Sequence, residues 1–405
     1  MNNKKTFTTY LVYLFVLIFP WLLLSGSCKK KNSKSDEPTI AEDTTMQYYK
    51  ADNSAFEYYG RIDFSNAQAP TFSYEGVSIK AKFQGKAVDV VIRDYADGSD
   101  ETKTNYYTII IDNAVYKVLK VTSADTLYKI SRNLSNGDHT IEIFKRTEGM
   151  VGKSSFLGLR ILAAKQLLPS PGKPLRKIEI IGDSYSAAYG DEASIPGPPA
   201  GNPRVSFHSV NENNYTSWCA ILARTVNAQY SCIARSGFGM YRDYDGNTAN
   251  VLPNIYTQIH SEYSTPTWNT TNYTPDLILI MLGGNDVGPE DATTPDMLDS
   301  AAFVNKYINF VGTLRSYYPS ASIVCVTTSA VTDAYPVGLK TLTRMKSYTN
   351  AVKAYHNAHG DSKVYYTEMG PPNGSPYGEN WHPSNATQKA MADLMIPYVK
   401  SLMGW

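Results

Sequence analysis

Lys177-Ile-Glu-Ile-Ile-Gly-Asp-Ser184 is the stretch of the sequence that decides the fold. Its first five residues form a short, mostly apolar run, which is typical of a strand covered on both faces. Gly182 and Asp183 end the run, and Ser184 stands where a helix can begin. A serine in that position lies at the sheet edge near unpaired backbone N–H groups, as a nucleophile requires. Taken alone, a helix cap is at least as good an interpretation, because Asp and Ser are common N-caps.

Strands and helices alternate after this stretch. Further strands are predicted at 230–234, 276–281, 322–328 and 363–367, and helices at 217–226, 302–317, 342–356 and 385–402. This alternation indicates a parallel sheet with helices on both faces. Residues 177–405 are therefore predicted to form an α/β domain with a parallel sheet. Its catalytic groups should gather beyond the carboxyl ends of the strands.

The preceding region, residues 45–162, has the pattern of an all-β domain. Residues 72–83 alternate apolar and polar side chains, and turn signals separate further short strands at 87–92, 106–111, 116–121 and 140–144. Short strands at this spacing predict a β-sandwich or jelly roll. Residues 163–176 contain three prolines and one glycine and are predicted to be a linker.

The first 44 residues have the pattern of a targeting segment. Residues 10–24 are almost wholly apolar, which is too short for a membrane span of about 20 residues but fits a signal-peptide core. The following Ser25-Gly-Ser-Cys28 loosely resembles a bacterial lipobox. We expect a signal peptide at 1–27, a lipid on Cys28 and a flexible tether at 28–44. The protein would then be lipid-anchored in the cell envelope or secreted; an ordinary secretory peptide and an uncleaved anchor stay open.

Composition excludes one class of partner. The 38 Lys and Arg residues against 37 Asp and Glu residues give a net charge of +1, so no bulk electrostatic attraction to nucleic acid is expected. The 31 tyrosines fit β-sheet propensity, or a surface that packs against sugar rings. The sequence has no Cys-x-x-Cys pair of the kind that binds zinc. Cys219 and Cys232 could pair, but nothing in the sequence requires a disulfide.

Two further segments that could carry chemistry follow predicted strands. Gly283-Gly-Asn-Asp286 comes directly after the strand at 276–281, and an Asn side chain there can donate to a developing oxyanion, although a plain turn explains the segment equally well. Glu379-Asn-Trp-His-Pro-Ser384 precedes the last helix. Of the six histidines, His382 alone lies between a strand and a helix of the α/β domain and follows an acid. It is therefore the candidate base for Ser184.

These segments together resemble the SGNH (GDSL-like) hydrolase superfamily. Gly182-Asp-Ser184, Ser236-Gly237, Gly283-Gly-Asn-Asp286 and His382-Pro383 match its four blocks in order. The resemblance implies a flavodoxin-like parallel sheet. It also implies that Ser184 is the nucleophile and that His382 is its base. It also implies an oxyanion hole made of the N–H groups of Ser184 and Gly237 and the side chain of Asn285.

A narrower resemblance is to carbohydrate esterase family two, which joins a jelly roll to an SGNH domain. Tyr59-Gly-Arg61, residues 76–85, Lys145-Arg-Thr-Glu-Gly149 and Trp381-His-Pro-Ser384 carry it. The family implies removal of acetyl groups from acetylated polysaccharides or oligosaccharides of the xylan and mannan type. It implies no cofactor and no metal. Asp183 and Trp381 are candidates for substrate contacts, and we expect a monomer whose membrane contact is the lipid at Cys28.

The role of Glu379 stays open in the sequence. The superfamily usually has Asp three residues before the histidine, and this chain has Glu379 there. Either its carboxylate orients His382 in a triad, or a backbone carbonyl does so in a Ser–His dyad. Two rival functions are also open. One is a lipase or thioesterase acting on longer acyl chains, and the other is a glycan-binding surface lipoprotein with a vestigial hydrolase fold.

Overall fold

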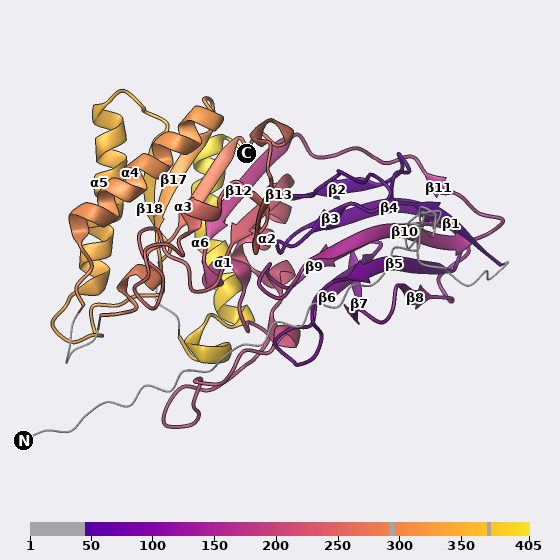
Figure 1. Ribbon diagram of the computed structural model, residues 1–405, viewed down its shortest axis with the longest axis horizontal. Helices are drawn as coiled ribbons and strands as arrows, with labels where there is room; N and C mark the ends of the chain where they lie inside the picture. The colour runs from indigo at the N-terminus through magenta and orange to yellow at the C-terminus, as the bar shows by residue number, and fades with distance from the viewer. Residues whose placement is uncertain (1–44, 291–295, 371–373) are drawn as a thin grey trace, which may run out of the picture. The chain divides into compact units, whose positions relative to one another are not determined.

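The computed structural model describes residues 45–290, 296–370 and 374–405 (Figure 1). The predicted signal peptide, Cys28 and the tether lie outside these ranges. Within them, no helix combines the length and apolar character that crossing a membrane requires.

The N-terminal region is a sandwich of two antiparallel sheets. One sheet has the order β1 (Met46–Lys50), β10 (Ser154–Leu162), β5 (Val88–Asp94) and β8 (Leu127–Ser131), with β3 (Thr71–Phe72) beside β10. The other has the order β11 (Leu167–Leu168), β4 (Ser78–Gln84), β9 (Asp138–Lys145), β6 (Tyr106–Ile111) and β7 (Ala114–Lys120), with β2 (Glu57–Tyr59) beside β4.

Alternation of side chains builds the core of this sandwich. In β4, Ile79, Ala81 and Phe83 are buried, whereas the two lysines between them are partly exposed. Successive residues of a strand point to opposite faces, so the apolar set meets the facing sheet. Strand β11 lies inside the segment 163–176 that was predicted to be a linker. Because β11 pairs with β4, this segment is held against the sandwich.

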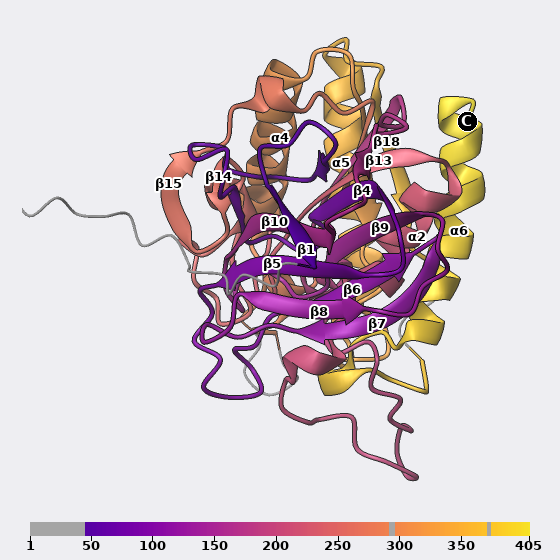
Figure 2. The same ribbon diagram turned by 90° about the vertical axis from the view of Figure 1, so that its right-hand side faces the viewer.

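The C-terminal region is a parallel sheet covered by helices. The strand order is β13 (Ala228–Ala234), β12 (Arg176–Gly182), β16 (Leu277–Met281), β17 (Ser322–Thr327) and β18 (Val364–Glu368). Helices α2 (Trp218–Thr225) and α6 (Asn385–Met403) pack on one face, and α4 (Ser300–Tyr317) and α5 (Thr341–Ala358) pack on the other (Figure 2). The predicted fold class is confirmed.

Short elements complete the domain at the ends of the strands. They are helices α1 (Ser184–Ala187) and α3 (Leu252–Ile255), the hairpin β14 (Gln258–His260) and β15 (Tyr263–Thr267), and 3₁₀ turns at Ser209–Asn211, Asn214–Thr216, Thr270–Asn272, Asn285–Val287 and Glu379–Trp381. Cys219 and Cys232 are buried free thiols, and both Sγ atoms approach the carbonyl oxygen of Ser186, at 3.7 and 3.9 Å.

Buried charges join the sandwich to the parallel-sheet domain. Glu179 lies in the middle of β12, and its carboxylate forms an ion pair of 3.6 Å with Arg61 of the sandwich; both side chains are inaccessible to solvent. Arg61 also donates to the carbonyl oxygens of Tyr256 and, at 3.2 Å, Gln258. A buried charge is tolerated only when it is paired and hydrogen-bonded. Each domain therefore supplies a group that the other needs.

We expect Arg61→Met to lower the free energy of unfolding by about 3–5 kcal/mol, because it leaves the buried carboxylate of Glu179 without its cation. Urea unfolding measures this change. The matched control is Lys389→Met, which removes the cation from the exposed pair Lys389–Asp393 and should cost less than about 0.5 kcal/mol. Equal changes in the free energy of unfolding of the two variants would show that burial of the Arg61–Glu179 pair does not contribute to stability.

Candidate active site

Ser184 is the first residue of helix α1, just beyond the end of β12, which lies between β13 and β16 in the sheet. Asp183 caps this helix, and its carboxylate accepts the N–H of Tyr185 at 3.0 Å. The N–H of Ser184 has no helical partner, because the first N–H groups of a helix have no carbonyl four residues earlier. Ser184 therefore combines its hydroxyl with a free donor at the sheet edge.

The side chain of Asp183 is almost completely buried. It is only 1% exposed, and burial raises the pKa of its carboxyl to about 7. One carboxylate oxygen is used in the cap of α1, and a contact between Asp183 and substrate stays a prediction. By capping α1, Asp183 fixes the backbone of the helix that begins at Ser184.

His382 meets Ser184 from the loop before α6. The Oγ–H of Ser184 donates to Nε2 of His382 at 2.8 Å. On the other side of the ring, Nδ1 donates to the carbonyl oxygens of Glu379 and Asn380, at 3.0 and 3.1 Å. A carbonyl oxygen only accepts, so the ring proton must sit on Nδ1 and the lone pair of Nε2 must face the serine. This is the tautomer that a general base needs.

The carboxylate of Glu379 is directed away from His382. It accepts the backbone N–H of His208 at 2.8 Å, Nδ1–H of His208 at 2.7 Å and the side-chain N–H of Asn211 at 2.7 Å. Of the two arrangements that the sequence left open, the structure has the main-chain carbonyl beside His382. The carboxylate instead holds the loop around His208, and its hydrogen bond is the main cause that raises the pKa of His208.

A strained turn brings both carbonyls to the ring. Asn380 and Trp381 have φ angles of +48° and +66°, a region that residues with a Cβ rarely occupy. Such strain is characteristic of functional sites. The turn also leaves Trp381 37% exposed beside His382, with its ring 5.0 Å from that of Tyr377. A contact between Trp381 and substrate stays a prediction.

Aromatic rings keep His382 neutral. The ring of Tyr189 stacks on it at 4.2 Å between centroids, and the ring of Tyr185 lies at 5.4 Å. This burial lowers the pKa of His382 to about 4, although the two carbonyl oxygens act in the opposite direction. The imidazole is therefore ready to accept a proton at neutral pH.

The candidate oxyanion donors follow the strands on either side of β12. Gly237 comes after β13 and Asn285 after β16, and these two strands flank β12 in the sheet. Gly237 has a φ of +81°, and a Cβ at this position would have no heavy atom within 4 Å, so its backbone is open to a ligand. Among the residues that the structure describes, the side-chain N–H₂ of Asn285 donates once, to the carbonyl oxygen of Phe238 at 2.9 Å. Its second N–H is left for an oxyanion.

A buried carboxylate braces the loop that carries Gly237. Asp286 accepts the backbone N–H groups of Met240, Tyr241 and Arg242 at 2.8, 2.6 and 3.0 Å. Burial raises the pKa of Asp286 to about 6, against the effect of these three donors. The sequence pointed to the segment of Asp286 but not to this function, because the acceptor and its donors are more than forty residues apart.

The sandwich holds the same loop from its other side. The carboxylate of Glu148 accepts the backbone N–H of Ser236 at 2.8 Å and also the hydroxyl of Ser236, next to Gly237. Glu75 accepts the N–H of Ala234 at 3.1 Å, and Glu212 accepts the N–H of Glu148 at 3.0 Å. Glu148 is therefore a positioning residue for Gly237, supplied by a domain that contains neither Ser184 nor His382.

Among the described residues, no group of three or more His, Cys, Asp or Glu side chains is arranged to hold a metal ion. The imidazole of His382 contacts Ser184, and the candidate oxyanion donors follow the two strands that flank β12.

Comparison with known families assigns both halves of the chain. Residues 58–171 match the family described as carbohydrate esterase 2 N-terminal, and residues 180–390 match the GDSL-like lipase/acylhydrolase family. These matches confirm the resemblance found in the sequence blocks.

Named relatives agree with this assignment. The chain is 34% identical to the cellulase/esterase CelE of Acetivibrio thermocellus over 87% of its own length, and it spans 40% of that protein. It is 25% identical to an acetylxylan esterase/glucomannan deacetylase of Cellvibrio japonicus, over 96% of this chain and 99% of the relative.

A solved structure covers the same region. The family two carbohydrate esterase from Clostridium thermocellum, in complex with cellohexaose, is 32% identical and has a TM-score of 0.76; 86% of this chain and 99% of that chain are covered.

We expect Glu379→Gln to change kcat by less than about tenfold, because main-chain carbonyls orient His382 and remain in place. Removing the charge of a true triad acid costs about 10⁴ in kcat. Hydrolysis of a nitrophenyl acetate measures the difference, with His382→Ala as the control that removes the base. A loss of several orders of magnitude in a folded Glu379→Gln variant would contradict the dyad.

We expect kcat/KM to fall as the pH drops through about 4, because only neutral His382 accepts the proton from Ser184. If His382 were an ordinary solvated histidine, the fall in kcat/KM would occur near pH 6.5. The parallel control is Asp183→Asn, since the pKa of Asp183 is about 7. Asp286→Asn is a second control, because the pKa of Asp286 is about 6. A fall in kcat/KM near pH 6.5 that persists in both variants would show that His382 titrates as a solvated ring.

We expect Glu148→Ala to lower kcat by about tenfold or more with little change in KM, because a displaced Gly237 N–H weakens an interaction made mainly in the transition state. The matched control is Glu142→Ala, which removes a carboxylate of the sandwich that pairs with Lys80 at the surface. Circular dichroism verifies that both variants fold. An unchanged kcat, or a change confined to KM, would contradict the positioning role.

Proposed function

Because the chain belongs to the GDSL-like lipase/acylhydrolase family and carries the N-terminal domain of carbohydrate esterase family two, we propose that it removes O-acetyl groups from polysaccharides. The observation that carries the proposal is the hydrogen bond of 2.8 Å between Ser184 Oγ and His382 Nε2. It places an activated hydroxyl at the sheet edge among candidate oxyanion donors. Acetylated xylan and glucomannan are the proposed substrates, because the relatives from Cellvibrio japonicus are named for both.

The proposed reaction proceeds through an acyl-enzyme. Ser184 Oγ attacks the acetyl carbonyl carbon while its proton passes to Nε2 of His382. The N–H groups of Ser184 and Gly237 and the amide of Asn285 stabilise the oxyanion. The bond between the acetyl carbonyl carbon and the sugar oxygen then breaks, and the sugar oxygen takes the proton from His382. Water repeats the sequence on the acetyl-serine, so acetate leaves and Ser184 is restored.

Neutral groups stabilise the imidazolium that forms in each half of this reaction. The carbonyl oxygens of Glu379 and Asn380 face Nδ1–H, so their dipoles favour the protonated ring. The nearest carboxylate of the turn, that of Glu379, is already committed to His208 and Asn211. Stabilisation of the cation therefore depends on the backbone of the strained turn.

We expect Ser184→Ala to lower the rate of acetate release from acetylated xylan by several orders of magnitude while the protein remains folded. Asn285→Ala should lower kcat by about 10²–10³, the usual cost of one oxyanion donor. The substrate panel contains acetylated xylan, acetylated glucomannan and long-chain nitrophenyl esters. Near wild-type turnover by Ser184→Ala would exclude it as the nucleophile, and a preference for the long-chain esters would instead indicate a lipase.

We also propose that the chain is exported and lipidated at Cys28, on the strength of the apolar run at 10–24 and the cysteine that follows it. Cys28 lies outside the described residues. Replacing Cys28 by Ala should move the protein from the membrane fraction to the soluble fraction of the cell envelope. Fractionation of cells expressing both forms tests this, and equal distribution would reject lipidation.

We propose that the active unit is a monomer, because Ser184, Gly237, Asn285 and His382 are contributed by one chain. Sedimentation equilibrium of the active protein tests this, and a stable dimer would reject it.

A further inference from the structure

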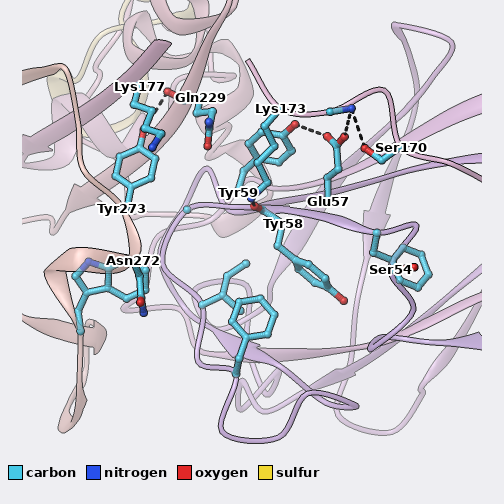
Figure 3. Close-up of a pocket in the computed structure, with 16 residues that line it drawn as sticks. Ser54, Glu57, Tyr58, Tyr59, Ser170, Lys173, Lys177, Gln229, Asn272 and Tyr273 are labelled. Carbon is cyan, nitrogen blue, oxygen red and sulfur yellow. Dashed lines mark hydrogen bonds between the residues drawn. The ribbon is translucent and has the colours of Figure 1, made fainter. Parts of the chain in front are cut away.

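A pocket lies at the opposite edge of the parallel sheet from Ser184. Lys177 and Gln229 line it near the starts of β12 and β13, whereas Ser184 follows the end of β12. A strand rises about 3.3 Å per residue, so the length of β12 separates the two edges by roughly 20 Å. The pocket has a volume of about 780 Å³ (Figure 3), which is within the range of ligand sites in proteins.

Aromatic rings from both domains form much of the pocket wall. They are Phe56, Tyr58, Tyr59 and Phe64 of the sandwich and Trp268 and Tyr273 of the parallel-sheet domain. Aromatic faces pack against the C–H groups of sugar rings. The hydroxyls of Tyr58 and Tyr273 donate to the carbonyl oxygens of Ala51 and Ile178, at 2.5 and 2.9 Å. These two rings are therefore held in place before any ligand arrives, which lowers the entropy cost of binding.

Polar side chains at the pocket have unused hydrogen-bonding capacity. The amide of Asn272 and the hydroxyl of Ser54 line the pocket (Figure 3), and neither side chain makes a hydrogen bond to another described residue. An amide both donates and accepts, as does a hydroxyl. Rigid rings beside such groups match the alternating apolar and polar surface of a sugar chain.

The pocket lining carries two positive charges and one negative charge. Lys173 and Lys177 line it, and neither forms an ion pair with any part of the chain that the structure describes. The ammonium of Lys173 donates to the carbonyl oxygen of Tyr58, and that of Lys177 lies 6.0 Å from the centre of the Tyr273 ring. Glu57 is the carboxylate of the lining, and it already accepts the N–H of Gly172 at 2.9 Å and the hydroxyl of Tyr59.

Three charges act together in the lining. Burial lowers the pKa of Lys173, the carboxylate of Glu57 opposes this shift, and the charge of Lys177 adds a smaller lowering. Two ammonium groups against one carboxylate leave the lining with a net positive charge, and a ligand carboxylate would gain charge-assisted hydrogen bonds from both ammonium groups.

We propose that this pocket is a second, non-catalytic glycan site that binds a sugar chain bearing a carboxylate, such as a uronic acid residue. The inference rests on the proposed function for the idea that the chain meets polysaccharide. A glycan held at this edge would keep the enzyme on the polymer while Ser184 acts on another part of it. Binding at two sites raises the effective concentration of substrate without any new contact at the catalytic centre.

The test measures binding by calorimetry to the full chain carrying Ser184→Ala. The probes are acetyl-free xylo-oligosaccharides of one length, with and without a glucuronic acid branch. We expect the acidic probe to bind more tightly, and the double variant Lys173→Gln/Lys177→Gln to weaken its binding by about tenfold or more. The matched control is Lys86→Gln/Lys129→Gln, which removes two exposed lysines of the sandwich outside the pocket and should change nothing.

Two further measurements separate this site from the catalytic centre. With Ser184 intact, Lys173→Gln/Lys177→Gln should hydrolyse a nitrophenyl acetate at the wild-type rate, since a small ester needs no second site. Trp381→Ala should leave binding of the acidic probe in place. Equal affinity for the two probes, no effect of the lysine variant, or loss of acidic-probe binding in Trp381→Ala would each overturn the second site. Failure of the proposed function is recognised separately, because it appears as no acetate release from acetylated xylan by the wild-type protein.

Discussion

Buried charge at the junction of the two domains is the constraint on which the rest of the structure depends. Glu179 sits in β12, an interior strand of the parallel sheet, where an unpaired carboxylate would be prohibitively costly, and Arg61 of the sandwich neutralises it. Glu148 makes the complementary contact by reaching from the sandwich to the backbone of Ser236. Neither domain satisfies its buried polar groups alone, so the sandwich is part of the folded catalytic unit.

This junction connects stability to catalysis. The loop that carries Gly237 is held by Glu148 from the sandwich and by Asp286 from its own domain. An oxyanion donor is useful only if it is fixed before charge develops, because reorientation during the reaction would cost part of the stabilisation. The carboxylates of Glu148 and Asp286 thus fix the N–H of Gly237 before the reaction begins.

The environment of His382 follows a different principle. A carboxylate beside Nδ1 would favour the imidazolium before substrate binds, whereas the carbonyl oxygens select the tautomer and raise the pKa of His382 by less than burial lowers it. Stacking against Tyr189 removes water from the ring and lowers its pKa to about 4. The result is an imidazole that stays neutral over the physiological range. Glu379 is thereby free to fix the neighbouring loop through His208.

Local sequence by itself determined the order of the elements and the residues at the ends of the strands. The carboxyl ends of parallel strands meet at one edge, so Ser184, Asn285 and His382 could be placed together from periodicity and chain order. Side-chain direction could not be placed in that way. Whether Glu379 faces His382 or His208, and whether Glu148 reaches Ser236, depends on contacts between residues far apart in the chain. Only the tertiary structure decided these contacts, because long-range packing and the need to pair buried charge select one orientation among several that the local chain allows.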